Sequence, residues 1–87
     1  MNFGQAIEAL KQGKKVARKG WNGKGQFLYL INGESFEYRV YADMSCLLDK
    51  DLMHSDVIAI YTTNNVIQVG WLASQTDMLC EDWYIVE

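Results

Sequence analysis

Residues 18–25 concentrate three glycines, three cations, an asparagine and a tryptophan in the run Arg18-Lys19-Gly20-Trp21-Asn22-Gly23-Lys24-Gly25. A turn needs only one or two residues that tolerate a positive φ, such as glycine or asparagine. It does not need a tryptophan, because an exposed indole leaves a large apolar area in water. Trp21 is therefore expected to stack either on the core or on a ligand.

The residues before this run predict a helix and a short strand. Apolar residues at Phe3, Ala6, Ile7 and Leu10 have the spacing of one helical face. Asn2 and Gln5 form a predicted capping box at the start of this helix, and Gly13 is the predicted residue just beyond its end. Lys15–Arg18 is then expected to be a strand that leads into the glycine-rich loop.

The residues after the loop predict further strands. Residues 26–32 and 57–61 are apolar on both faces of an extended chain, and Asn64-Asn65 predicts a tight hairpin into residues 66–69. A last short strand is expected at residues 83–86. The sequence predicts one domain, 1–87, of the α+β class: an N-terminal helix packed on a small antiparallel β-sheet, with one further short helix near the C-terminus.

One helix of this length covers only one face of such a sheet. The other apolar face then needs a second cover, and a domain of 87 residues gains most by sharing a face with another copy. We therefore expect a homo-oligomer, most simply a dimer of dimers.

The charge distribution and the cysteines indicate which partners and which surroundings the sequence favours. Six of the eight Lys and Arg residues fall between Lys11 and Lys24, although the net charge is -3. This distribution makes residues 11–24 locally positive but leaves no extended basic face, so no nucleic acid polymer is expected as a partner. No apolar run is long enough to cross a membrane. Cys46 and Cys80 are expected to be reduced and buried.

Residues 33–56 carry the weakest pattern. Phe36, Tyr38 and Val40 alternate as in a half-exposed strand, and Met44 to Leu48 could form a helical turn. Asp49, Asp51 and Asp56, near His54, lack the spacing of a calcium loop, so solvated loop charges are favoured over a cation site.

No enzymatic chemistry is indicated. His54 is the single histidine and lies far in sequence from both informative stretches, and a metal site would need closely spaced ligands. The glycines around Lys24 match neither the dinucleotide fingerprint nor a phosphate-binding Walker loop. Residues Asp77, Glu81 and Asp82 have no evident partner for acid–base work. The sequence predicts a protein without catalytic residues, metal or cofactor.

The second informative stretch is residues 71–77, Trp71-Leu72-Ala73-Ser74-Gln75-Thr76-Asp77. Ser74 and Asp77 have the spacing of an N-cap and its third helical residue, so the plain structural interpretation is a capped short helix. The functional interpretation is a set of donors and acceptors beside an aromatic ring, as a sugar or nucleotide site requires. The two interpretations are compatible.

Two functions remain open on these residues alone. One is a small-molecule binding module, in which Trp21 and Trp71 stack on a base and nearby cations meet phosphates. The other is a protein-interaction module that binds a host protein through the Trp21/Trp71 surface. A nucleotide site requires these groups to converge in a recess, whereas a protein interface tolerates a flat patch.

Both stretches resemble those of the Thoeris anti-defence two family. The resemblance lies in residues 17–25, in residues 71–79 followed by Glu81-Asp82-Trp83, and in the N-terminal run from Asn2 to Ala6. It implies a phage-encoded sponge that acts in the cytoplasm of the infected bacterial host. Such a sponge captures, without cleaving it, a cyclic ADP-ribose isomer made by Thoeris TIR proteins, such as glycocyclic ADP-ribose. The resemblance also implies a homotetramer with the ligand held between subunits.

The predicted ligand-binding residues come from the two stretches. Trp21 and Trp71 are expected to stack on the adenine, and Asp77 is expected to accept hydrogen bonds from ribose hydroxyls. Arg18 or Lys24 is expected to face the phosphates. The remaining predicted contacts are Asn22, Ser74, Gln75 and Thr76.

Overall fold

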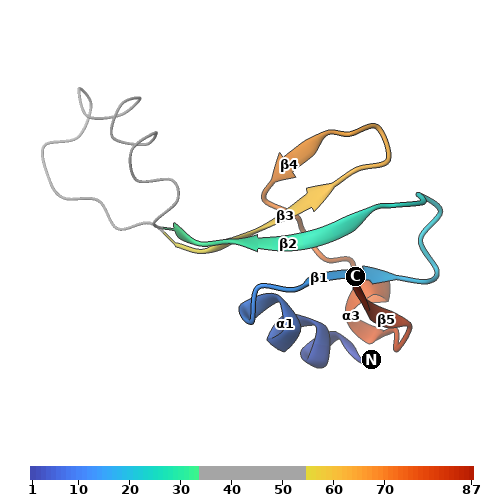
Figure 1. The fold of residues 1–87 in the computed structure, drawn as a ribbon. Coiled ribbons are helices and arrows are strands. Elements are labelled where there is room, and N and C mark those ends of the chain that lie inside the picture. Colours follow the sequence, from blue (N-terminus) through green and yellow to red (C-terminus); the bar gives the residue numbers. More distant parts are fainter. Residues whose placement is uncertain (34–54) are drawn as a thin grey trace, which may run out of the picture.

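The computed structural model describes residues 1–33 and 55–87, and its elements follow the predicted order (Figure 1). These elements are α1 (Phe3–Lys11), β1 (Lys15–Arg18), β2 (Phe27–Ile31), β3 (Val57–Tyr61), β4 (Ile67–Val69), α3 (Gln75–Leu79) and β5 (Trp83–Val86). The predicted α+β class is confirmed. The expectations for residues 36–48, Cys46 and His54 lie outside the described residues.

Helix α1 begins and ends as its sequence predicts. Asn2 Oδ1 accepts from the Gln5 amide at 2.8 Å, and Gln5 Oε1 accepts from the Asn2 amide at 2.9 Å, which completes the capping box. At the other end, Gly13 has a φ of 84°. Its amide donates to Leu10 O and the Lys14 amide donates to Ala9 O, which is the Schellman arrangement that ends a helix.

The five strands form one antiparallel sheet in the order β4-β3-β2-β1-β5. Strand β5 is last in sequence but lies beside β1, with Arg18 opposite Trp83. The hairpin between β3 and β4 differs from the predicted two-residue turn. The Thr62 amide donates to Val66 O across a three-residue loop, and within it only Asn65 has a positive φ, of 61°.

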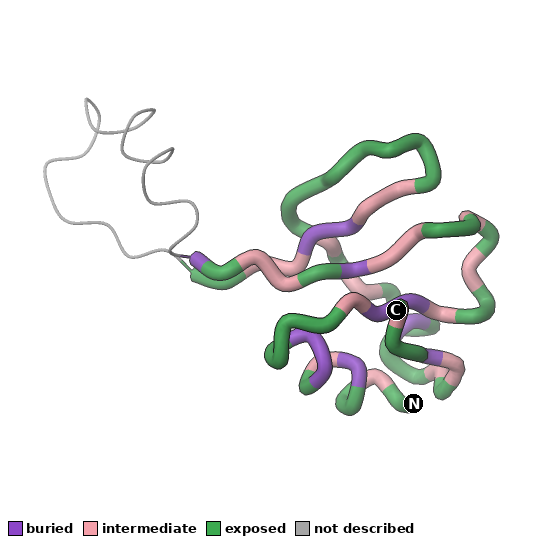
Figure 2. The backbone as a smooth tube through the Cα atoms, viewed as in Figure 1, coloured by how far each residue is buried: buried purple, intermediate pink, exposed green. Residues whose placement is uncertain are grey.

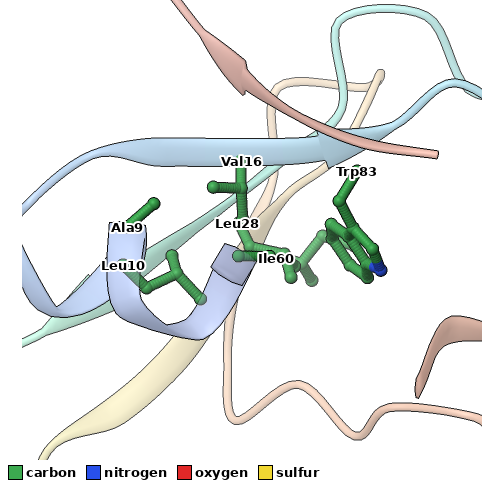
Figure 3. Packing of buried hydrophobic residues seen from close by; sticks show 7 residues of the cluster. Ala9, Leu10, Val16, Leu28, Ile60 and Trp83 are labelled. Atoms are coloured by element: carbon green, nitrogen blue, oxygen red, sulfur yellow. The ribbon is translucent and has the colours of Figure 1, made fainter. Parts of the chain in front are cut away.

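The core lies between α1 and one face of the sheet. Side chains from α1, β1, β2, β3 and β5 meet there (Figure 3), namely Ala6, Ala9, Leu10, Val16, Leu28, Ile60 and Trp83. Trp21 and Trp71 pack against this cluster from the loops. Helices α1 and α3 contact each other as well as the sheet.

The opposite face of the sheet is apolar and largely exposed. We call it the open face and define it by Phe27, Tyr29, Tyr61, Ile67, Val69 and Tyr84, which share a side through the strand register. Phe27 and Tyr61 stack there with ring centroids 5.0 Å apart. Tyr29, Ile67, Val69 and Tyr84 are all exposed. Figure 2 shows the exposure of β4, which carries Ile67 and Val69, in green. Among the described residues no helix is long and apolar enough to cross a membrane.

Candidate functional site

The candidate site is built where the loop after β1 meets the start of α3. The loop carries Trp21, and the segment between β4 and α3 carries Trp71. Arg18 at the end of β1 points to the same side of the sheet as Val16, toward the core and α3. The antiparallel pairing of β1 with β5 therefore brings together residues more than fifty positions apart in the sequence.

Three tryptophans form the aromatic part of the site. The ring centroids lie 6.3 Å apart for Trp21 and Trp71, 5.4 Å for Trp21 and Trp83, and 6.2 Å for Trp71 and Trp83. All three contacts are edge-to-face, which is a favourable arrangement for aromatic pairs. Trp83 is buried, while Trp21 and Trp71 are half-buried. Trp21 and Trp71 therefore do not form two parallel plates with a gap between them for a base. Each ring could stack on a ligand only through its outer surface.

Arg18 is the centre of an ionic network beneath these rings. Its Nη1 lies 2.7 Å from Asp77 Oδ1, and its Nε lies 2.9 Å from Asp82 Oδ1. Its Nη2 also donates to Cys80 Sγ at 3.1 Å. The side chain is only 10% exposed. The guanidinium that sequence reasoning offered to phosphates is thus committed to two carboxylates of its own chain.

Asp77 has its acceptor positions filled by the protein. Oδ1 accepts from Arg18 Nη1 and from Trp21 Nε1 at 3.2 Å. Oδ2 accepts from the Ser74 amide at 3.0 Å and from the Ser74 hydroxyl at 2.9 Å. Four hydrogen bonds match the lone-pair sites of one carboxylate. The capping-box interpretation of Ser74 and Asp77 is confirmed, and the contact to a ribose hydroxyl stays a prediction.

These contacts hold both carboxylates in the ionised form. The hydrogen bond from Arg18 is the main cause that lowers the pKa of Asp82. For Asp77, burial acts to raise the pKa, but hydrogen bonds from Ser74, Arg18 and Trp21 outweigh burial and lower it. The same two carboxylates raise the pKa of Arg18. Carboxylates with lowered pKa values are weak general bases near neutral pH.

The other predicted site residues are exposed. Asn22 and Lys24 lie in the loop, and Gln75 and Thr76 lie on the first turn of α3. The structure therefore brings Trp21, Trp71, Arg18, Ser74 and Asp77 into contact. The other four side chains are exposed to solvent.

The sequence did not predict the partner of Asp82 or the degree of burial of Cys80. Asp82 was weighed as an acid or base without a partner, and its partner Arg18 lies 64 positions away. The register of β1 with β5 would have revealed the pair, since it sets Arg18 opposite Trp83. Cys80 was expected to be buried, but it is half-buried.

A hollow of about 410 Å³ lies elsewhere, between α1 and β5. Its lining includes Asn2, Gln5, Ala9, Lys14 and Ile85, and none of the predicted site residues contributes to it. Among the described residues there is also no group of three His, Cys, Asp or Glu side chains that could hold a metal ion. The tryptophan cluster with its ionic network remains the candidate site.

Comparison with known proteins gives one family. The sequence model of the Thoeris anti-defense 2-like domain matches residues 1–86. A curated relative, Thoeris anti-defense 2 of Bacillus phage SP01, is 41% identical over 86 residues, which cover 99% of this chain and 94% of the relative. The match runs through the loop, the tryptophan cluster and the ionic network. The chain therefore belongs to the Thoeris anti-defense 2-like family.

Proposed function

We propose that this protein is a phage anti-defence protein that binds and sequesters a cyclic ADP-ribose-type signal of the Thoeris system without cleaving it. The family match over residues 1–86 is the observation that carries the proposal. Two features of the site support binding rather than turnover. Trp21 and Trp71 belong to one aromatic cluster, and the carboxylates of Asp77 and Asp82 are held ionised by Arg18.

The contacts separate residues that bond within the protein from residues that we assign to the ligand. Arg18, Ser74 and Asp77 form the internal frame, because Arg18 and Ser74 both hydrogen-bond to the Asp77 carboxylate. The adenine would stack on the outer surface of Trp21 or Trp71, a contact worth roughly 1–3 kcal/mol per base. Lys24 is the exposed cation of the predicted set, so we assign the pyrophosphate to it rather than to Arg18. Asn22, Gln75 and Thr76 would contact the remaining hydroxyls.

Incubation with the product of a Thoeris TIR enzyme tests this function. A sponge should take up the nucleotide at a molar ratio equal to its number of sites, with nanomolar affinity or about -12 kcal/mol. Heating should release it with unchanged mass by mass spectrometry. Loss of the nucleotide at sub-stoichiometric protein would contradict sequestration and indicate an enzyme.

Matched lysine variants locate the phosphate contact within the same experiment. Lys24→Ala should weaken binding by about tenfold or more, because a hydrogen bond to a charged group contributes roughly 1.5–3 kcal/mol. Lys19→Ala removes an exposed cation of the same loop that lies outside the predicted set. Equal affinities of the two variants would show that Lys24 does not meet the phosphates. A parent protein that takes up no nucleotide would favour the protein-interaction alternative.

We also propose that the open face is covered by a second copy of the chain and that two such pairs form a tetramer. Ile67 and Val69 on β4 are 61% and 54% exposed, and Tyr29 on β2 and Tyr84 on β5 are exposed on the same side of the sheet. Several large apolar side chains exposed on one side of a sheet are typical of an interface. Self-complementary patches assemble most simply with two-fold symmetry.

Light scattering at micromolar concentration should therefore give about four times the chain mass of 10.0 kDa. Val69→Lys should dissociate the assembly, because it places a charge in the apolar contact. Gln68→Lys adds the same charge on the same strand but on the other side of the sheet, so this control should keep the parent mass. A parent protein of single-chain mass would overturn the proposal.

A further inference from the structure

Asp82, the residue immediately before β5, forms hydrogen bonds with the first residues of the loop that carries Trp21. Asp82 Oδ1 accepts from Arg18 Nε at 2.9 Å, and Asp82 Oδ2 accepts from the Gly20 amide at 2.8 Å. The backbone carbonyl of Asp82 accepts from the Lys19 amide at 3.1 Å. Asp82 therefore contacts three successive residues, 18–20, at the point where β1 ends and the loop begins.

The residue type at position 20 fits this close approach. A Cβ atom on Gly20 would lie 2.8 Å from Asp82 Oδ2 and 3.2 Å from Arg18 Nη2. The first distance is shorter than real Cβ contacts allow, so a side chain at this position would force the loop and the Asp82 carboxylate apart. The absence of a side chain lets the backbone amide reach Asp82.

The position of Trp21 follows from these contacts. Its amide donates to Arg18 O at 3.3 Å, and its indole donates to Asp77 Oδ1. Asp77 thus holds the ring, while Asp82 holds the backbone immediately before it. Neither anchor alone defines where the ring stands, since a ring tethered at one atom can still turn with its backbone.

We infer that Asp82 is a positioning residue of the site: it anchors the Trp21 loop through Gly20 and Arg18 so that the indole stands ready to stack on a ligand. This inference rests on the proposed function for its ligand and on the described contacts for the anchor. Asp82 itself lies beneath the loop and is not assigned any contact with the nucleotide. Its side chain is 30% exposed, so its replacement is expected to loosen the loop rather than unfold the domain.

Asp82→Asn tests the inference, with Glu81→Gln as the matched control because Glu81 is the exposed neighbouring carboxylate. Amide hydrogen exchange of the ligand-free protein reports the loop, and calorimetry with the TIR-derived cyclic ADP-ribose isomer reports binding. In Asp82→Asn the Gly20 amide should exchange about tenfold faster, as expected for the loss of one charge-assisted hydrogen bond. The Val16 and Leu28 amides of the core should keep parent rates. Affinity should fall about tenfold with an unchanged number of sites.

The outcomes separate the anchor from the function. Parent-like exchange at Gly20, or a loosened loop that binds with parent affinity, would overturn the inference. If Asp82→Asn also loses protection in the core, the binding test is repeated with Gly20→Ala. This variant separates the loop from the Asp82 carboxylate and keeps every charge. Parent-like affinity of Gly20→Ala would again overturn the inference. A parent protein that binds no nucleotide refutes the proposed function, and faster exchange at Gly20 confined to Asp82→Asn would still establish the anchor.

Discussion

Replacing Arg18 with methionine should lower the free energy of unfolding by about 3–5 kcal/mol, the usual cost of removing one partner of a buried ion pair. The Arg18 side chain is 10% exposed and its partner Asp77 is 12% exposed, so water cannot replace the lost guanidinium fully. Domains of this size have total stabilities of roughly 5–15 kcal/mol. Urea denaturation at neutral pH, followed by circular dichroism, should show the loss directly.

Two further variants test the cause of this effect. Lys19→Met removes an exposed cation at the next position and should change stability by less than about 0.5 kcal/mol. Arg18→Lys keeps the charge but lacks the planar fork that reaches Asp77 and Asp82 together, so it should fall between the other two. If Arg18→Met is as stable as Lys19→Met, the network does not hold the fold together.

Local patterns predicted the elements because each element carries its own signals. Asn2 with Gln5, and Gly13 at the end, determine α1 through short-range hydrogen bonds. Strands β2 and β3 are apolar on both faces, and this pattern also predicted the open face that the structure shows. The β3–β4 turn was placed correctly but one residue too short, because Asn64 and Asn65 look alike in sequence and only Asn65 takes the left-handed conformation.

The site was harder to predict because its contacts depend on strand pairing. Trp21, Trp71, Ser74 and Asp77 were singled out by composition, and the structure brings them together. The partners of Arg18 could not be predicted, since a cation near glycines looks the same whether it faces a phosphate or carboxylates of its own chain. The relative orientation of the tryptophan rings depends on Trp83, which packs them edge-on instead of in parallel.

The ionised state of Asp77 ties stability to pH. Its pKa is lowered from an ordinary value of 3.8 in the folded protein. A group of this kind contributes stability that is fully present above its unfolded pKa and is lost as the pH falls through its folded pKa. The parent protein should therefore lose stability progressively as the pH falls below about 4.

Asp77→Asn should lower the free energy of unfolding at pH 7 by about 1–3 kcal/mol, because the amide nitrogen cannot accept from Arg18 and Trp21 or from Ser74. Binding should weaken as well, because Trp21 loses the acceptor that holds its ring. Denaturation at a series of pH values gives the measurement, and the stability of Asp77→Asn should depend less on pH than that of the parent below about pH 4. Glu81 is an exposed carboxylate on the same segment, so the stability of Glu81→Gln should follow the pH curve of the parent. If the stability of Asp77→Asn also follows that curve, the charge of Asp77 does not stabilise the folded chain.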